Sequence, residues 1–580
     1  MKKNTLILLV CLFSVTLLSA QSTYTVSSPD DDGTGTLRHF VSNVEAGDII
    51  NIPSGYTIVL NSEIAIEKHI TINGQGATIK VAEPGVSTHR LFTLGTASGG
   101  SILNISLKDL KLQGGDIKLN TEGSSPNHGG AILIVKRVNL ALNNCEITDS
   151  KADRGGAIYV GDGVGVSALF EDCLFKGNSA SSYGGACAFL KSQSQTDGPG
   201  EAVIKNTVFE ANTSGGSAAM TMNIPATFTS CIFKDNASSG TSRGSCTFQV
   251  NDNPSGNVRL NSCTFAGNTT AAIDPEGNAD GGIFVAQKGP TTTYFLTNCT
   301  FYDNHGGRGT IYLFAGKMFM VNCTITGNVA YNKNNYAGGF YGTTDATNET
   351  KEAIFVNNIF AYNYSMNNSN SQILDTYFGA KPVISADKNV IASTRKANDA
   401  PVTITNPVAF FYDDDPSYDD PLFESYTTNR NGHKIPAYDA VTGTVALAAN
   451  GVATGTGLSK EMVIDPEIEA LIPLEDQRGL TRSTTAPSLG SYEYGALTSI
   501  DNKVSEKVAP YITTNPATGY LYLNNNDQIS RMDIIDLAGR VVVSQVYPDS
   551  SISLSNVPNG YYIVRFETPA GVITEKLIVR

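Results

Sequence analysis

The chain has 580 residues, of which 41% are hydrophobic, 16% are charged and 56 are glycine. This composition supports a large folded core and excludes a disordered, highly charged polymer. Because the formal charge is −14 and no basic patch or stripe stands out, we expect no nucleic-acid partner and no binding to anionic membrane surfaces.

Residues 1–20 have the pattern of an export signal peptide. Lys2 and Lys3 precede an apolar run that ends in small residues near Ala20, where we expect cleavage. A lipoprotein signal is the alternative, but Val10 stands before Cys11, where such signals carry a small residue. No other run approaches the ~20 apolar residues of a membrane-spanning helix, so we expect no transmembrane segment.

Residues 21–84 are expected to form an N-terminal cap and the first coils of a larger domain. One short helical pattern lies near Leu37–Val44. It is followed by the strand-like stretches TIVL, IAIEKHITING and ATIKV, which alternate apolar and polar residues at short spacing.

Two short phrases alternate between residues 129 and 363, inside a repeat domain that we expect over residues 85–495 and that becomes less regular after residue 380. The first reads DCLFKGN at 172–178, SCIFKDN at 230–236, SCTFAGN at 262–268 and NCTFYDN at 298–304. The second reads GGAI at 129–132, GGAIY at 155–159 and GGACAF at 184–189. Each phrase is rich in β-branched or aromatic residues and bounded by turn residues, which predicts strands in a stacked repeat.

The repeat predicts an all-β fold, a parallel β-helix (solenoid). Cys and Phe lie two residues apart in the first phrase, so both side chains point to the same, inner face of a strand. The Asn that closes each phrase falls where the strand turns, and stacked Asn amides form hydrogen-bonded ladders. We therefore expect Phe233 and Phe265 on adjacent layers of one interior.

Eight cysteines remain after removal of Cys11, an even number that favours disulfides in an exported chain. The stacking geometry opposes this interpretation, because in-register side chains keep the ~4.8 Å strand spacing whereas a disulfide needs its Cβ atoms ~3.5–4.5 Å apart. Cys187 and Cys246 have a whole coil between them, which carries Ala218. A ladder of buried thiols is the prediction.

The GGAI and FxxN phrases resemble the repeats of polymorphic outer-membrane proteins, which are secreted right-handed parallel β-helix proteins and adhesins. The stretch DQRGLTRSTTAPSLGSYEYG at 476–495, with DPLF at 420–423, is similar to the closing motif of choice-of-anchor Q domains of Bacteroidetes surface proteins. The first resemblance implies the fold, and the second implies no chemistry.

Residues 496–506 read as a polar linker, and residues 507–580 alternate strands and turns as in a small antiparallel β-sandwich. This C-terminal part resembles the sorting domain of the type IX secretion system at Gly539, Arg540, Gly560, Lys576, Val579 and Arg580. The resemblance implies export across both membranes by that machinery, removal of the sorting domain, and attachment to surface lipopolysaccharide or release. An ordinary adhesive sandwich module is the alternative.

The loops after the FxxN turns are the candidate binding face. His305 and Arg308 offer a base and a carboxylate clamp for a polysaccharide lyase or glycosidase. Tyr331, Tyr336, Tyr364 and Asp280 offer rings and polar groups for a glycan or a host protein. A row of solvated loops is the alternative interpretation.

Asp413, Asp415 and Asp419 offer hard oxygen ligands for calcium, although they lack the ligand order of a known calcium loop. A solvated acidic turn is the alternative, and we expect no other cofactor. From these patterns we expect a secreted, surface-anchored, non-catalytic protein for adhesion or for glycan or protein binding. The alternative is a polysaccharide lyase or glycosidase acting on acidic glycans in a β-helix groove.

Overall fold

A computed structural model describes the protein over most of its length. The described residues are 21–96, 101–119, 127–161, 167–190, 200–242, 244–251, 256–270, 281–287, 292–331, 334, 336–342, 351–367, 370–379, 383–396, 402–410, 422–463, 465–496, 511–512, 517–524, 529–536, 539–546, 548, 551–568 and 571–580. The chain divides into two compact units, one ending at Ala496 and one formed by Leu497–Arg580. The expected signal peptide lies outside the described residues.

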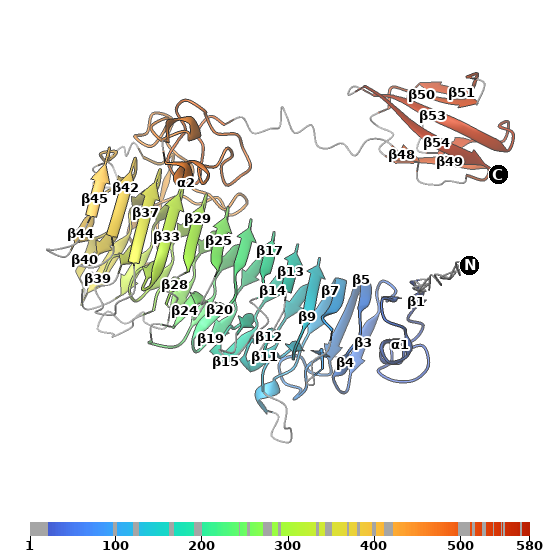
Figure 1. Ribbon diagram of the computed structural model, residues 1–580, viewed down its shortest axis with the longest axis horizontal. Helices are drawn as coiled ribbons and strands as arrows, with labels where there is room; N and C mark the ends of the chain where they lie inside the picture. Colours follow the sequence, from blue (N-terminus) through green and yellow to red (C-terminus); the bar gives the residue numbers. More distant parts are fainter. Residues whose placement is uncertain are drawn as a thin grey trace, which may run out of the picture. The chain divides into compact units, whose positions relative to one another are not determined.

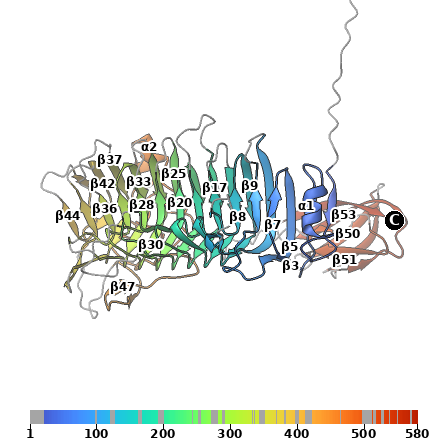
Figure 2. The ribbon, with the colours of Figure 1, turned by 90° about the horizontal axis from the view of Figure 1, so that it is seen from below.

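The first unit is a parallel β-helix, as the repeat predicts. Its strands form three long sheets of 24, 9 and 12 strands, and every described pairing between successive coils is parallel (Figure 1). Strands distant in sequence therefore lie side by side, as both views across the stack show (Figures 1 and 2).

One coil shows how the sequence makes its corners. Strands β21 (Ala226–Thr229), β22 (Ile232–Lys234), β23 (Ala237–Ser238) and β24 (Cys246–Val250) follow one another around it. The chain turns at Ser230 and Asp235, which both adopt left-handed backbone angles (φ 53° and 56°). Short polar residues and glycine tolerate this conformation, so Asn, Asp, Ser or Gly recurs at most of the corresponding corners, with exceptions such as Ala211 and Tyr362.

The interior is filled by a column of stacked rings. Phe209, Phe233, Phe265 and Phe301 lie on successive coils with ring centres 4.5–4.8 Å apart, and all four are fully buried. Phe233 pairs with Phe265 in register. The expected layering of these two residues is confirmed.

The closing Asn residues form a second column, in which each amide is fully bonded. Asn212 donates through its backbone N–H and its side-chain amide to Oδ1 of Asn236 (2.9 and 3.0 Å). Asn236 in turn donates to the carbonyl of Phe209 (2.8 Å) and to Oδ1 of Asn268 (2.9 Å). The same pattern continues to Asn363, which donates to the buried carboxyl of Asp375 (2.8 Å). The Asn ladder thus ends at the Asp375 carboxyl, which accepts the hydrogen bond of the last amide.

The eight described cysteines are all free and buried. Burial raises the pKa of Cys187 and Cys246, and in Cys231 it is joined by a hydrogen bond to the thiol of Cys263 that raises the pKa further. These side chains act as small core residues and as weak thiol donors, as the ladder interpretation expects.

The two ends of the β-helix are built differently. Helix α1 (Leu37–Asn43) lies at the N-terminal end, where Thr36 caps it by accepting from the N–H of His39 (3.2 Å). At the other end, the last strands of the stack are β44 (Thr394–Lys396) and β45 (Val402–Thr405).

Residues 422–496 do not add coils, although the sequence places them in the repeat domain. They fold back along the outside, with hairpin β46 (Tyr426–Thr428) and β47 (Lys434–Pro436) on one side and α2 (Pro466–Glu469) on another (Figure 2). They lack the two alternating phrases, so they have no inward Phe and Asn columns to stack.

The second unit is a small antiparallel sandwich. A four-stranded sheet, β51-β50-β53-β54, and a three-stranded sheet, β48-β49-β52, share one apolar core. The shorter strands are β48 (Tyr511–Ile512), β49 (Tyr520–Asn524), β50 (Arg531–Asp536), β51 (Val541–Val546) and β52 (Ser551–Ser553). Its longest strands are β53 (Gly560–Thr568) and β54 (Gly571–Val579), which pair over their whole length.

Candidate functional site

The outer face of the 24-stranded sheet carries a groove of about 660 Å³. Its floor is formed by residues that pair in register from one strand to the next, which we call a register column. The column crosses β5 (Ile70–Val81), β7 (Leu103–Gln113), β9 (Val138–Asn143), β13 (Ser167–Glu171) and β17 (Ala202–Lys205). The residues of this column are Thr71, Ser106, Ala141, Leu169 and Val203. Small side chains on three successive coils leave the face hollow, and Leu169 is 45% exposed within it.

A polar row borders this floor two residues earlier on each strand. It consists of His69, Asn104, Asn139, Ser167 and Glu201. The side chain of Asn139 donates to Oδ1 of Asn104 (2.9 Å), and the backbone N–H of Asn104 donates to Nδ1 of His69 (2.9 Å). These bonds hold the row in order, so the groove offers hydroxyl, amide and imidazole groups at a regular spacing.

The titratable residues that line the groove stand far apart. His69 and Glu201 occupy opposite ends of the polar row, four coils from each other. At a strand spacing of ~4.8 Å this is a separation of about 19 Å. Paired carboxylates of glycosidases lie ~5–9.5 Å apart, so the described lining residues do not form such a pair.

A second hollow, of about 770 Å³, lies on the same outer face further along the stack. Its floor comes from the ends of β21, β25 (Asn257–Asn261) and β29 (Thr293–Thr297), and its wall from residues 470–479. Arg259 follows Val203 and Thr227 in the floor column of the groove. The two hollows therefore share one face of the solenoid.

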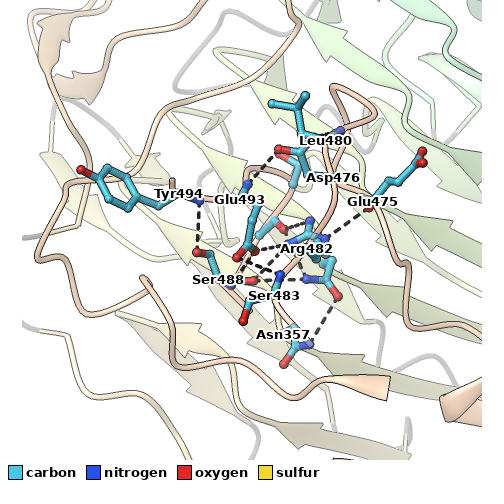
Figure 3. Close-up of polar contacts among 12 residues, drawn as sticks. Asn357, Glu475, Asp476, Leu480, Arg482, Ser483, Ser488, Glu493 and Tyr494 are labelled. Atoms are coloured by element: carbon cyan, nitrogen blue, oxygen red, sulfur yellow. Dashed lines mark hydrogen bonds and ion pairs between the residues drawn. The ribbon is translucent and has the colours of Figure 1, made fainter. Parts of the chain in front are cut away.

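The wall of the second hollow is fixed by buried polar contacts around Arg482 (Figure 3). Arg482 donates to Glu493 (3.3 Å) and to Oδ1 of Asn298 in the solenoid (2.9 Å). Burial lowers the pKa of Arg482 to about 10, while the nearby Glu493 opposes this change. Gln477 adds hydrogen bonds to Thr264 (2.7 Å) and Thr300 (2.6 Å). The closing motif 476–495 thus joins neighbouring coils through these hydrogen bonds, and we call it the clasp.

His305 lies elsewhere, in an enclosed position. It belongs to β31 (His305–Gly306) of the nine-stranded sheet, and its side chain is fully buried. Nε2 lies 2.9 Å from Asp303, Nδ1 lies 3.0 Å from the Tyr331 hydroxyl, and Arg430 lies against the ring. Burial lowers the pKa of His305, so the ring is neutral near pH 7. A base in this position has no access to a polymer.

The tyrosines expected beside it are covered as well. Tyr331 accepts from the side-chain amide of Asn431 (2.7 Å), and Tyr364 donates to the carbonyl of Lys434 (2.6 Å) and stacks on His433. Both rings are 2% exposed, because residues 426–436 fold over them. At His305, Tyr331 and Tyr364 the expected open binding face is therefore an internal contact. The repeat contains no pattern that predicts the segment covering these residues.

Arg308 takes a different set of partners. Its guanidinium carbon lies 4.9 Å from the ring centre of Tyr336 and 5.8 Å from that of Tyr341, on the outer side of the 12-stranded sheet. Tyr341 stacks on Tyr377 at 5.1 Å. His305 and Arg308, expected as a base and a carboxylate clamp at one site, thus lie in different surroundings, one enclosed beside Tyr331 and the other beside Tyr336.

Asp280, Asp413, Asp415 and Asp419 lie outside the described residues. Among the residues that are described, no group of three or more His, Cys, Asp or Glu side chains is placed to hold a metal ion. Calcium remains a prediction.

The residues that suggested a sorting domain define its turns and its last strands. Gly539 adopts φ +80° in a turn in which Arg540 pairs with Asp536 (2.8 Å). Gly560 pairs with Val579 across β53 and β54, and Lys576 with Ile563. The backbone N–H of Arg580 donates to Ala517 (3.0 Å). The motif residues thus join the final strand to both sheets.

Comparison with known families bears on this same unit. Residues 514–580 match the secretion system C-terminal sorting domain. The second unit is a type IX secretion sorting domain. The protein therefore interacts with the type IX secretion machinery, and this sorting domain directs it to the cell surface or the extracellular space. Within the described part of the chain, no helix has the length and apolarity of a membrane span.

Two solved structures show a low similarity to the chain. The crystal structure of pectate lyase Pel9A shares 13% identity at a TM-score of 0.35, over 82% of this chain and 97% of that one. Jun a 1, the major allergen from cedar pollen, shares 14% identity at a TM-score of 0.17, over 69% and 85% of the two chains. No curated protein matches the sequence at a significant level.

The sequence patterns do not predict the groove across β5 to β17. Its floor residues come from strands outside the two repeated phrases, and their spacing along the chain varies with the loops between them. The sequence pattern around His69 predicts only a strand. A column of small outward residues becomes visible only when the register of the coils is known.

Proposed function

We propose that the protein is an extracellular, surface-displayed binder of glycan chains, and that the groove across β5 to β17 holds the glycan. The observation that carries this proposal is the hollow of about 660 Å³, with a floor of small side chains and a row of polar groups along it. Apolar floors with a few convergent polar groups are typical of binding sites for small molecules and sugars.

The spacing of the polar row suits an extended polymer. Neighbouring coils present equivalent groups every ~4.8 Å. This distance is close to the length of one pyranose unit in an extended chain, so successive sugars along the solenoid axis meet successive rungs. Asn104, Asn139 and Ser167 then bond hydroxyl groups, while the exposed Leu169 packs against the face of a ring.

The arrangement favours binding over cleavage. The lining acid and base, Glu201 and His69, stand about 19 Å apart, and His305 is enclosed. The alternative of a polysaccharide lyase or glycosidase therefore has no support from the position of these groups. Removal of the sorting domain and attachment to surface lipopolysaccharide belong to the same proposal, since they place the groove outside the cell.

The test fills the groove without touching the core. Ala141→Phe puts a ring on the half-exposed floor, and Ala65→Phe puts the same ring on an exposed position of β4 (Ile64–Ile66) in the 12-stranded sheet. Binding of the purified protein is measured on a glycan array and by affinity electrophoresis in neutral and acidic polysaccharides.

We expect the unmodified protein and Ala65→Phe to bind the same glycans, and Ala141→Phe to lose at least tenfold in affinity. Equal binding by Ala141→Phe contradicts the proposal. Release of unsaturated or reducing sugar ends by the unmodified protein replaces it with the catalytic alternative.

A further inference from the structure

Arg259 occupies an unusual place on the outer face of the solenoid. It stands in the same register column as the groove floor, paired with Phe295 on the next coil, and its guanidinium carbon lies 3.9 Å from the centre of the Phe295 ring. Phe295 stacks in turn on Phe319 at 5.3 Å with planes 3° apart. A guanidinium supported on a column of rings is held in a fixed plane at low cost in entropy.

This guanidinium has no carboxylate partner among the described residues. Arg259 lines the second hollow, and its side chain is only partly buried. The other arginine of the hollow, Arg478, is already engaged, because it binds Asp476 (2.6 Å) and lies over the ring of Tyr492 (3.6 Å). Among the described residues that line this hollow, Arg259 is therefore the guanidinium whose N–H groups are available to a ligand.

The surroundings of Arg259 suit a hydroxylated molecule. Thr229, Asn261 and Thr297 line the hollow from neighbouring strands. The hollow of about 770 Å³ falls in the size range of ligand sites. Glu475, also in the lining, is exposed at the rim.

The wall opposite the strands is preorganised. Ile472 packs on Val321 and Val356, and the carbonyl of Glu475 accepts from the side-chain amide of Asn298 (2.7 Å). Lys317 forms an ion pair with Glu467 of α2 (3.2 Å). A hollow with a fixed wall loses little freedom when a ligand enters.

We propose that this hollow, bounded by β21, β25, β29 and residues 470–479, is an anion-binding site in which Arg259 grips a carboxylate or sulfate group carried on a hydroxylated ligand such as a sugar. The guanidinium fork bonds two oxygens of the anion, and the Thr and Asn side chains bond the hydroxyl groups. The site is separate from the groove of β5 to β17, and its occupation does not depend on a glycan in that groove.

The experiment compares two sugars that differ in one group. Ligand-observed NMR on the full chain measures binding of glucuronate and of glucose, and sulfate is added as a competitor. The variants are Arg259→Gln, which removes the charge, Arg259→Lys, which keeps the charge but loses the fork, and Glu475→Gln, which removes a negative charge at the rim. Lys111→Gln is the control, because Lys111 is a 58% exposed cation on the distant strand β7.

We expect glucuronate to bind and glucose to fail. Arg259→Gln should weaken glucuronate by about 10- to 100-fold, since a hydrogen-bonded charge is lost. Arg259→Lys should fall between, Glu475→Gln should tighten binding, and Lys111→Gln should change nothing. Displacement by sulfate assigns the site to both kinds of anion, and failure of sulfate assigns it to carboxylates.

Three results overturn the proposal. They are equal binding of glucose and glucuronate, unchanged binding of glucuronate in Arg259→Gln, and no binding of glucuronate to the unmodified protein. Because Ala141→Phe leaves this hollow intact, binding of glucuronate to that variant separates the anion site from the groove.

Discussion

Replacement of Asn236 by alanine tests the ladder that holds the coils in register. The Asn236 side chain accepts two hydrogen bonds from Asn212 and donates one each to Phe209 and Asn268. Asn236→Ala leaves two N–H groups of Asn212 and the carbonyl of Phe209 without these partners in a fully buried position. Each unsatisfied buried group costs about 1–3 kcal/mol, so the three groups together should lower the unfolding free energy of the variant by about 3–9 kcal/mol.

This loss is a large part of the ~5–15 kcal/mol that stabilises a typical domain. It is measured as a shift in the midpoint of urea denaturation followed by circular dichroism. Hydrogen exchange then locates the weakened coils, which should be those of Asn212, Asn236 and Asn268, since each coil contacts only its neighbours.

The control is Asn257→Ala, an exposed amide on β25. It should change the unfolding free energy by less than about 0.5 kcal/mol. If Asn236→Ala costs no more than this control, the ladder does not stabilise the solenoid and the reasoning fails.

Four further predictions follow from the same contacts. Burial raises the pKa of Asp375 from 3.8 to about 7, although the hydrogen bonds that its carboxyl accepts oppose this change, so between these pH values the folded protein binds more protons than the unfolded chain. The unfolding free energy should therefore fall as pH rises through this window. Asp375→Asn should flatten this pH dependence, measured by denaturation at a series of pH values. Arg482→Met should leave the buried Glu493 carboxylate without its guanidinium partner and lower the unfolding free energy by about 3–5 kcal/mol. Limited proteolysis should then cleave residues 465–496 earlier than in the unmodified protein, and cleavage at the same rate in both proteins would argue against the clasp. Deletion of Val508–Arg580 should trap the protein in the periplasm, and surface labelling of the truncated form would contradict the sorting role. The eight cysteines should resist alkylation until the protein is unfolded, and a disulfide in the native protein would exclude the thiol ladder.

The repeat phrases are sufficient to predict the β-helix because they contain the residues that stack from coil to coil. Phe233 and Phe265 carry the core column, Asn236 and Asn268 carry the amide ladder, and the residue before each Cys turns the corner. Each of these roles depends only on the neighbouring coil, so a local pattern repeated along the chain is enough to specify it.

The outer face that carries the groove could not be predicted in the same way. Ser106, Ala141 and Leu169 become neighbours only through a register that depends on loops of unequal length. His305 and Tyr331 read as loop residues, yet residues 426–436 cover them after a separation of about a hundred residues in sequence. Nothing near His305 in the sequence indicates this contact. The sorting domain was recognised because its motif residues are contiguous with the strands that they join.

The most direct test of the account is a crystal structure of the secreted protein with the oligosaccharide that it binds most tightly. The account predicts sugar density along the outer face of β5 to β17, with successive rings over Ser106, Ala141 and Leu169. Density confined to another face, such as the rings around Tyr336 and Tyr377, would contradict it.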